Sequence, residues 1–170
     1  MEKIITHNFK QTQKIGQNFA HEILTAKPGQ STVILALQGD LGAGKTTFLQ
    51  GFAKGLGIKE VVNSPTFVIM KRFKITPRSS LRAKRSNLMF KNFYHFDLYR
   101  LNNPQEILDL GFGEIIKNPE NIVAIEWPEK IKEILPKDAI LITFDHLEPI
   151  SAKGDGEAKE NKREIKIDTF

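Results

Sequence analysis

The stretch GDLGAGKTTF, residues 39–48, fits the phosphate-loop pattern G-x-x-x-x-G-K-[ST], with its fixed positions at Gly39, Gly44, Lys45 and Thr46. Glycines let the backbone N–H groups fold around phosphate oxygens, the lysine would reach the terminal phosphates, and the threonine hydroxyl would hold Mg²⁺. A helix starting at this loop would aim the positive end of its dipole at the same anion. The motif predicts a nucleotide site, but kinases, GTPase switches, motors and other ATPases all use it.

The sequence on either side supports this interpretation. TVILALQ, residues 32–38, is a continuous apolar and β-branched run, as expected of a buried parallel strand. In the following TTFLQGFAKGLG, Phe48, Phe52 and Leu56 share one helical face and glycine closes the helix. Strand, glycine loop and helix are the elements that a phosphate loop requires, in the required order.

Length and composition narrow the class of protein. A chain of 170 residues suits one domain with a substantial core, so residues 1–170 are predicted to form a single unit. With no cysteine, disulfides and cysteine-ligated metals are excluded. No apolar run approaches a membrane span, and the N-terminus lacks the hydrophobic stretch of a signal peptide. We therefore expect a soluble, cytoplasmic protein with no membrane partner.

The net charge of +5 is concentrated in one segment. Residues 71–91, KRFKITPRSSLRAKRSNLMFK, hold eight of the 25 Lys and Arg residues and no acid. The remaining 17 basic residues are outnumbered by 20 acidic ones, so the rest of the chain is mildly acidic. The basicity is local and does not indicate a general RNA-binding surface.

Elsewhere helical and strand patterns alternate early and strands follow one another late. Residues 11–24 carry Ile15, Phe19 and Ile23 at helical spacing, and 103–112 read as a short helix closed by Gly111. The remaining segments read as a polar loop at 148–162 and as strands at 3–9, 92–101, 121–127, 139–147 and 163–170. The pattern predicts an α/β protein whose sheet has mixed strand pairing.

Phosphate chemistry with Mg²⁺ needs carboxylates at the carboxyl ends of strands beside the loop. Glu126 ends the apolar run IVAI, and Asp97 lies in HFDLYR, so both are candidates. Thr66 in SPTF is a candidate switch residue, whose hydroxyl could move onto Mg²⁺ or the γ-phosphate. Trp127, the only tryptophan, is either a core residue or an aromatic platform, whereas His95 is expected to be structural.

GDLGAGKTTF, SPTF, HFDLYR and IEWPE, in that order and spacing, resemble the TsaE (YjeE) family of bacterial ATPases. The family is needed to make threonylcarbamoyladenosine beside the tRNA anticodon. The resemblance covers roughly residues 3–70 and 93–170. It implies a P-loop NTPase-like three-layer fold with a small mixed parallel and antiparallel central sheet. It also implies weak intrinsic hydrolysis of ATP with Mg²⁺ and work alongside the TsaD–TsaB pair. TsaD performs the transfer, so tRNA would be met only indirectly, through that complex.

The resemblance also implies roles for particular residues. Lys45, Asp97 and Glu126 would be catalytic, and Thr46, Asp97 and Glu126 would bind the metal. Thr12 and Arg163 sit where family members close over the nucleotide, which is a weaker inference. The nucleotide contacts implied are Thr12, Gly39, Asp40, Leu41, Gly42, Ala43, Gly44, Lys45, Thr46, Thr47, Thr66, Trp127 and Arg163.

The chain departs from the family after SPTFVIM, where it inserts roughly twenty basic residues in place of a short hairpin. The charge and weak periodicity of residues 71–91 predict a mobile surface loop that does not join the core. Because closing a longer surface loop costs little, a tolerated, solvated insertion is the simplest interpretation. Its position in the chain, close after the expected switch at Thr66, leaves open a part in the mechanism.

Three other functions remain open at this point. Arg72, Arg78, Arg82 and Arg85 could imitate the lid of a small-molecule P-loop kinase, although no acid accompanies them to position an acceptor hydroxyl. A GTPase switch is disfavoured because NKRE at 161–164 lacks the aspartate of N-K-x-D. A direct RNA-binding module would use the basic insert with its phenylalanines.

Overall fold

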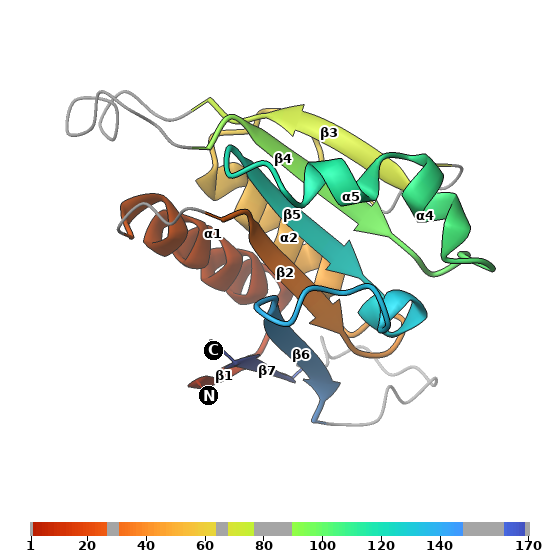
Figure 1. The fold of residues 1–170 in the computed structure, drawn as a ribbon. Helices are drawn as coiled ribbons and strands as arrows, with labels where there is room; N and C mark the ends of the chain where they lie inside the picture. Colours follow the sequence, from red (N-terminus) through yellow and green to blue (C-terminus); the bar gives the residue numbers. More distant parts are fainter. Residues whose placement is uncertain (1, 27–30, 64–67, 77–89, 148–161, 169–170) are drawn as a thin grey trace.

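Seven strands form one sheet in the order β1-β7-β6-β2-β5-β4-β3 (Figure 1). The computed structural model describes residues 2–26, 31–63, 68–76, 90–147 and 162–168. The strands are β1 (Glu2–Thr6), β2 (Val33–Gln38), β3 (Met70–Lys74), β4 (Asn92–Asp97), β5 (Asn121–Glu126), β6 (Ile140–His146) and β7 (Arg163–Asp168).

The centre of the sheet is parallel and its edges are antiparallel. β2 lies between β5 and β6 and is parallel to both, and β4 is parallel to β5. β3 closes one edge as the antiparallel partner of β4, while β7 and β1 continue antiparallel from β6 at the other edge. The expected mixed sheet is confirmed. The carboxyl ends of β2, β4, β5 and β6 meet at one edge, which is where a phosphate site belongs.

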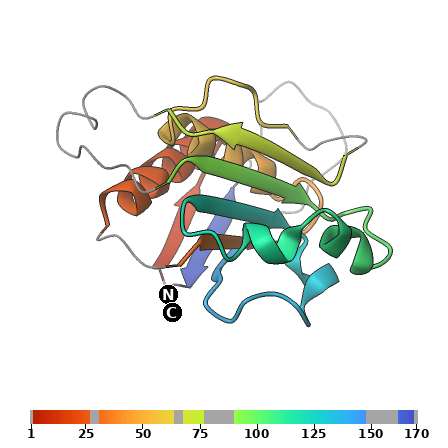
Figure 2. The same ribbon diagram turned by 45° about the horizontal axis from the view of Figure 1, so that its top comes forward.

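Helices cover both faces of the sheet (Figures 1 and 2). One core layer joins Phe19, Phe48 and Phe52 to the α1/α2 face of the sheet; the other joins Ile107 and Phe112 to the opposite face. The sheet between two helical layers confirms the three-layer architecture. The helices are α1 (Phe9–Thr25), α2 (Lys45–Gly55), α4 (Gln105–Asp109), α5 (Phe112–Ile115) and the 3₁₀ helix η1 (Pro128–Ile131).

Helices α1 and α2 pack with their backbones in close approach. A Cβ added at Gly51 would lie 1.9 Å from the carbonyl oxygen of Gln13, and one at Gly16 would lie 2.2 Å from that of Phe48. Only glycine fits at these two positions. The helix that starts at the phosphate loop is thereby held at a fixed distance from α1.

The prediction that residues 71–91 stay outside the core is wrong at both ends of the segment. All of β3 except its first residue lies within it, and the side chains of Phe73, Ile75 and Phe90 are buried in the α1/α2 core layer. Phe73 stacks on Phe93 of β4 at a centroid distance of 5.9 Å. The apolar residues of KRFKI alternate, and that period of two outweighs the charge around them. Residues 77–89 lie outside the described part of the chain.

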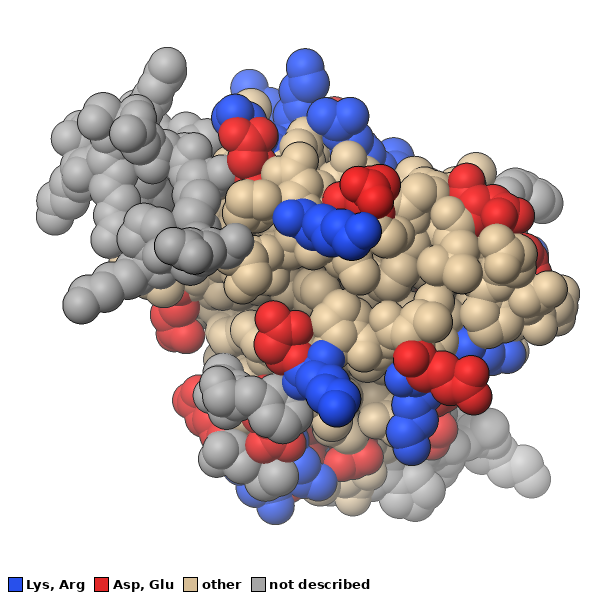
Figure 3. All heavy atoms as spheres, in the orientation of Figure 1, with Lys and Arg blue, Asp and Glu red and all other residues tan. Residues whose placement is uncertain are grey.

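Basic side chains gather over β3 at the edge of the sheet, and several are paired (Figure 3). Arg72 donates from Nε and Nη2 to the side-chain oxygen of Asn92, at 3.1 and 2.8 Å. Lys91 forms an ion pair with Glu120, and the Thr76 hydroxyl donates to the carbonyl oxygen of Gly57. These contacts join Arg72, Thr76 and Lys91 to neighbouring parts of the domain.

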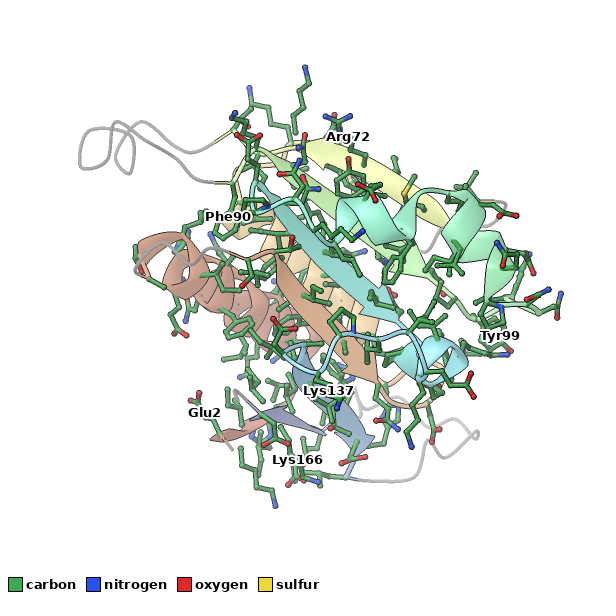
Figure 4. All side chains as sticks on the ribbon, viewed as in Figure 1. Glu2, Arg72, Phe90, Tyr99, Lys137 and Lys166 are labelled. Carbon is green, nitrogen blue, oxygen red and sulfur yellow. The ribbon has the colours of Figure 1, made fainter. Side chains whose placement is uncertain are left out.

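The basic segment leaves and re-enters the sheet at the end of the strands opposite the phosphate loop. Because β3 is antiparallel to β4, its last residues lie beside Asn92, the first residue of β4. Asp97 lies at the opposite end of β4. Figure 4 shows Phe90 and Tyr99 at these two ends. Phe90 therefore does not lie beside the expected nucleotide site, although the basic segment follows Thr66 closely in the sequence. Thr66 itself lies outside the described residues.

No helix in the described part of the chain combines the length and the apolar character that crossing a bilayer requires.

Candidate nucleotide site

The phosphate loop joins the carboxyl end of β2 to the first turn of α2. Gly39, Gly42 and Gly44 have φ values of 144°, 80° and 106°, a region that side-chain-bearing residues rarely adopt. The N–H of Ala43 donates to the carbonyl oxygen of Asp40 at 3.1 Å, and that of Phe48 donates to Gly44 at 2.9 Å. The expected strand, loop and helix are therefore present, and the loop residues precede the helix N-terminus.

Lys45 reaches back over its own loop. Its Nζ donates to the carbonyl oxygens of Gly39 at 2.5 Å and Asp40 at 2.9 Å. The same ammonium lies 4.0 Å from the centroid of the Trp127 ring, a cation–π contact. The Lys45 ammonium thus contacts two loop carbonyls and the indole ring of Trp127.

Burial lowers the pKa of Lys45 from its ordinary value, because a charged ammonium is poorly solvated there. Four carboxylates act in the opposite direction: Glu126, Glu129, Asp97 and Asp40. Acidic groups therefore surround the ammonium, and any phosphate entering the loop would compete with them.

Thr46 and Glu126 form the contact that a metal site would use. The Thr46 hydroxyl lies 3.0 Å from Oε1 and 3.1 Å from Oε2 of Glu126. Glu126 is 2 % exposed although it ends a strand, so its carboxylate faces inward toward the start of α2. The buried carboxylate of Glu126 therefore lies beside the Thr46 hydroxyl, next to the predicted phosphate loop.

Asp97 stands beside Glu126 on the neighbouring strand. The two residues are direct partners in the parallel β4–β5 ladder, so their side chains leave the sheet on the same face. Asp97 Oδ1 also accepts a hydrogen bond from the backbone N–H of Tyr99 at 3.1 Å, which orients the carboxylate. The structure thus brings together the two acids that sequence reasoning selected separately.

The residues present fit Mg²⁺. A hydroxyl and two carboxylates offer only oxygen ligands, which is the donor set that this hard cation prefers. Magnesium usually takes one or two carboxylates and completes its shell with water and substrate phosphates. Thr46, Asp97 and Glu126 supply that partial set beside the loop.

A pocket of about 730 Å³ opens at this edge of the sheet. Trp127, in a left-handed conformation at φ 64°, and half-exposed Tyr99 form one wall, with ring centroids 5.1 Å apart. The lining residues are Leu41, Gly42, Gly44, Lys45, Thr46, Thr47, Val68, Ile69, Asp97, Tyr99, Arg100, Glu106, Glu126 and Trp127.

Arg163 lies against the loop from the side of β7. A Cβ added at Gly44 would lie 3.1 Å from its Cδ and 3.2 Å from its Nε. Nε and Nη1 are buried and have no hydrogen-bond partner among the described residues, and burial lowers the pKa of the guanidinium. An arginine with unsatisfied donors beside a phosphate loop is suited to an anionic ligand.

Thr12 does not line the pocket. It is fully buried on α1, and its hydroxyl lies 2.9 Å from that of Thr6. Thr6 pairs with Arg163 in the β1–β7 ladder, so Thr12 stands behind the arginine. Of the remaining candidates, Gly39 and Asp40 hold Lys45 through their carbonyls, and Ala43 is buried within the loop.

Sequence reasoning missed two features of the site. His95, expected to be merely structural, is fully buried with Nε2 2.9 Å from Glu126 Oε1. Tyr99 and Arg100, which follow Asp97, line the pocket. The strand period of two places His95 on the same face as Asp97, and this signal could have identified it.

Comparison with known proteins identifies the family. Residues 6–153 match the family model described as Threonylcarbamoyl adenosine biosynthesis protein TsaE. A protein named tRNA threonylcarbamoyladenosine biosynthesis protein TsaE from Haemophilus influenzae is 37% identical over 133 residues, which are 78% of this chain and 75% of the relative. Its namesake from Bacillus subtilis is 41% identical over 119 residues, which are 70% of this chain and 63% of that relative.

A solved structure supports the same family assignment. The crystal structure of Bacillus subtilis YdiB superposes with a TM-score of 0.60 at 30% sequence identity, covering 98% of this chain and 83% of that one. The family-model match includes the predicted phosphate loop and the strands that carry Asp97 and Glu126. This chain therefore belongs to the TsaE family of threonylcarbamoyladenosine biosynthesis proteins.

Proposed function

We propose that this protein is a Mg²⁺-dependent P-loop ATPase of the cytoplasm that hydrolyses ATP slowly on its own. In this proposal its ATP cycle supports the TsaD–TsaB complex in the threonylcarbamoyladenosine modification of tRNA beside the anticodon. The observation that carries the ATPase assignment is the contact of the Thr46 hydroxyl with the buried Glu126 carboxylate, at 3.0 and 3.1 Å. Family membership supports nucleotide hydrolysis in general and the link to the modification pathway.

The loop residues would bind the triphosphate. Backbone N–H groups at the start of α2 would face the phosphate oxygens, and the helix dipole would favour the negative charge. Lys45 would exchange the carbonyls of Gly39 and Asp40 for phosphate oxygens. Arg163 lies beside Gly44, and its Nε and Nη1 have no hydrogen-bond partner among the described residues, so it would add a second positive contact.

Three side chains would serve the metal and the attacking water. Mg²⁺, held by Thr46, Glu126 and Asp97, would neutralise charge on the phosphates. Asp97 and Glu126 differ in burial: Glu126 is enclosed between β5 and α2, whereas Asp97 is part-exposed at the pocket. This difference favours Glu126 as the principal acid on the metal, while Asp97 would both bind the metal and orient the attacking water.

Thr66 in SPTF is proposed as the switch that senses the γ-phosphate. The motif follows α2 in the chain, and the described residues resume at Val68, which lines the pocket. A Thr66 hydroxyl that binds Mg²⁺ or the γ-phosphate would lose that contact on hydrolysis, which would link the nucleotide state to the partner complex.

The test is ATP hydrolysis by the purified chain, measured with and without Mg²⁺, then with purified TsaD–TsaB, and with tRNA as a separate addition. The proposal expects slow, Mg²⁺-dependent turnover that rises with the protein partners. Fast turnover of the chain alone, or phosphate transferred to a small metabolite, would instead favour a P-loop kinase. The position of Arg72 gives that alternative no support, because its side chain binds Asn92 at the far edge of the sheet.

A further inference from the structure

We infer that His95 is a positioning residue for the metal site: its Nε2–H holds one oxygen of Glu126 so that the other remains available. The inference rests on the proposed function and deepens it. It concerns a histidine that makes no contact with nucleotide in the proposed scheme and acts through the carboxylate of Glu126.

The geometry of the contact is direct. Nε2 of His95 lies 2.9 Å from Oε1 of Glu126, and both side chains are shielded from solvent, at 0 % and 3 % exposure. An ionised carboxylate can only accept hydrogen bonds, so the histidine must be the donor in this pair. A charge-assisted bond between two enclosed groups restrains the carboxylate more firmly than a contact in water would.

The other ring nitrogen indicates the tautomer. Nδ1 of His95 is buried and has no hydrogen-bond partner among the described residues. A hydrogen on Nδ1 would be a second donor without an acceptor among the described residues, so the hydrogen-bond geometry favours a hydrogen on Nε2 alone. The ring therefore offers Glu126 one donor.

The sheet register leaves room for this contact. His95 pairs with Ala124 in the β4–β5 ladder, and Asp97 pairs with Glu126 two residues further on. Because Ala124 has only a methyl group, the imidazole can reach diagonally across it to Glu126. The row His95–Asp97 on one strand thus faces the row Ala124–Glu126 on the next.

The histidine also distinguishes the two carboxylate oxygens. The Thr46 hydroxyl is nearly equidistant from them, at 3.0 and 3.1 Å, and does not select one. His95 engages Oε1 and leaves Oε2 without this bond. A purely structural role would be better served by an apolar residue, since the unsatisfied Nδ1 is costly in a core.

The test compares His95→Gln, His95→Asn and His95→Leu with the wild type. The Gln amide can place an N–H near the position of Nε2, whereas Asn is too short and Leu has no donor. Trp127, the only tryptophan and 4.0 Å from Lys45, is a built-in fluorescence probe of binding. Titrations with ADP and with a non-hydrolysable ATP analogue, in EDTA and over a range of Mg²⁺, separate nucleotide affinity from metal dependence.

In His95→Leu and His95→Asn we expect the half-saturating Mg²⁺ concentration to rise by about 10- to 100-fold, as is typical when an outer-shell partner of a metal ligand is lost. Affinity in EDTA should stay unchanged, and His95→Gln should remain close to wild type. Phe96→Leu, the next residue along β4 but in the opposite core layer, is the matched control for packing damage. Thermal melting of each variant confirms folding, and Asn preserves the test if Leu fails to fold.

Two outcomes overturn the inference while leaving the proposed function intact. One is a wild-type Mg²⁺ requirement in both His95→Asn and His95→Leu; the other is a loss in His95→Gln equal to that in His95→Leu. If the wild type itself shows no Mg²⁺-dependent response to either nucleotide, the proposed function fails, and the inference fails with it.

Discussion

Asp97 and Glu126 are paired residues on adjacent parallel strands, so two carboxylates leave the same face of the sheet side by side. The N-terminus of α2 lies over that face, and Thr46 bonds to one of the pair. Two acids side by side repel each other when both are ionised. A divalent cation between them would relieve that repulsion, which gives this geometry a physical reason.

Removing either charge should stop hydrolysis without unfolding the protein. Asp97→Asn and Glu126→Gln keep the size of each side chain, and we expect turnover to fall by about 100-fold in each, since metal binding and water activation need the negative charge. Initial rates of phosphate release measure the effect, and thermal melting verifies the fold. Unchanged turnover in both variants would return these acids to an ordinary structural role.

Lys45→Ala should weaken ATP binding or hydrolysis by at least ~10-fold, because a charge-assisted hydrogen bond contributes about 1.5–3 kcal/mol. Loss of the ammonium from the face of Trp127 should also change the fluorescence of the free protein. Lys54→Ala, an exposed lysine at the end of the same helix, is the matched control. Wild-type hydrolysis by Lys45→Ala would rule out the phosphate-loop assignment.

Gly51→Ala should destabilise the fold, because its Cβ would lie 1.9 Å from the carbonyl oxygen of Gln13. Overpacking typically costs about 1–3 kcal/mol, and a clash with backbone belongs at the upper end of that range. Gly113→Ala, where a Cβ meets nothing within 4 Å, is the control and should be neutral or slightly stabilising. Equal urea midpoints for the two variants would contradict the packing argument.

Replacing residues 77–89 with a short turn should change the free energy of unfolding by no more than about 1 kcal/mol, since loop closure depends weakly on length. ATP binding should also persist, because Phe90 and the pocket lie at opposite edges of the sheet (Figure 4). Phe73→Ala, by contrast, removes a ring buried in the core and should cost about 3–5 kcal/mol. Chemical denaturation distinguishes the two.

The same replacement tests whether the basic segment acts on RNA. Any attraction of tRNA to its charges should fall steeply with salt, because counterions are released from the phosphates. Binding of tRNA and complex activity are measured for both forms at low and physiological salt. A deletion that still binds its protein partners but loses activity at physiological salt would give the segment a part in the mechanism.

A fall in pH should weaken the ion pairs that Glu164 of β7 forms with Lys3 and Lys166. Hydrogen bonds from Lys166 and Lys3, at 2.8 and 2.5 Å, lower the pKa of Glu164 below its ordinary value of 4.5. The contribution is complete above pH 4.5, where the unfolded carboxyl is also ionised, and is lost as the pH falls through the folded pKa. Glu164→Gln should therefore show a shallower loss of stability below pH 4.5. Identical pH profiles of urea unfolding would contradict this assignment.

The residues that could be predicted from the sequence are those whose role depends on near neighbours in the chain. The phosphate loop is contiguous, and Glu126 is marked by the apolar run before it. The strand period places His95 on the same face as Asp97, but its diagonal contact with Glu126 depends on which strand lies beside β4, and a single sequence does not display that pairing. Phe73 was misplaced because its charged neighbours dominated the composition of the segment, although KRFKI has the alternation of a strand.

The glycine contacts between α1 and α2 decide how a local change at the phosphates can spread. Where only side chains separate two helices, rotamer changes let one slide along the other. Phe19 of α1 does contact Phe48 and Phe52 of α2, but at Gly16 and Gly51 the neighbouring atoms are backbone carbonyls, which have no alternative rotamers. A shift of α2 would therefore move α1 with it as one rigid body. α1 begins just after Asn8, close to Thr6, the residue of β1 that pairs with Arg163. The same motion would therefore displace both the start of α2 and the strands that hold Arg163 against the loop.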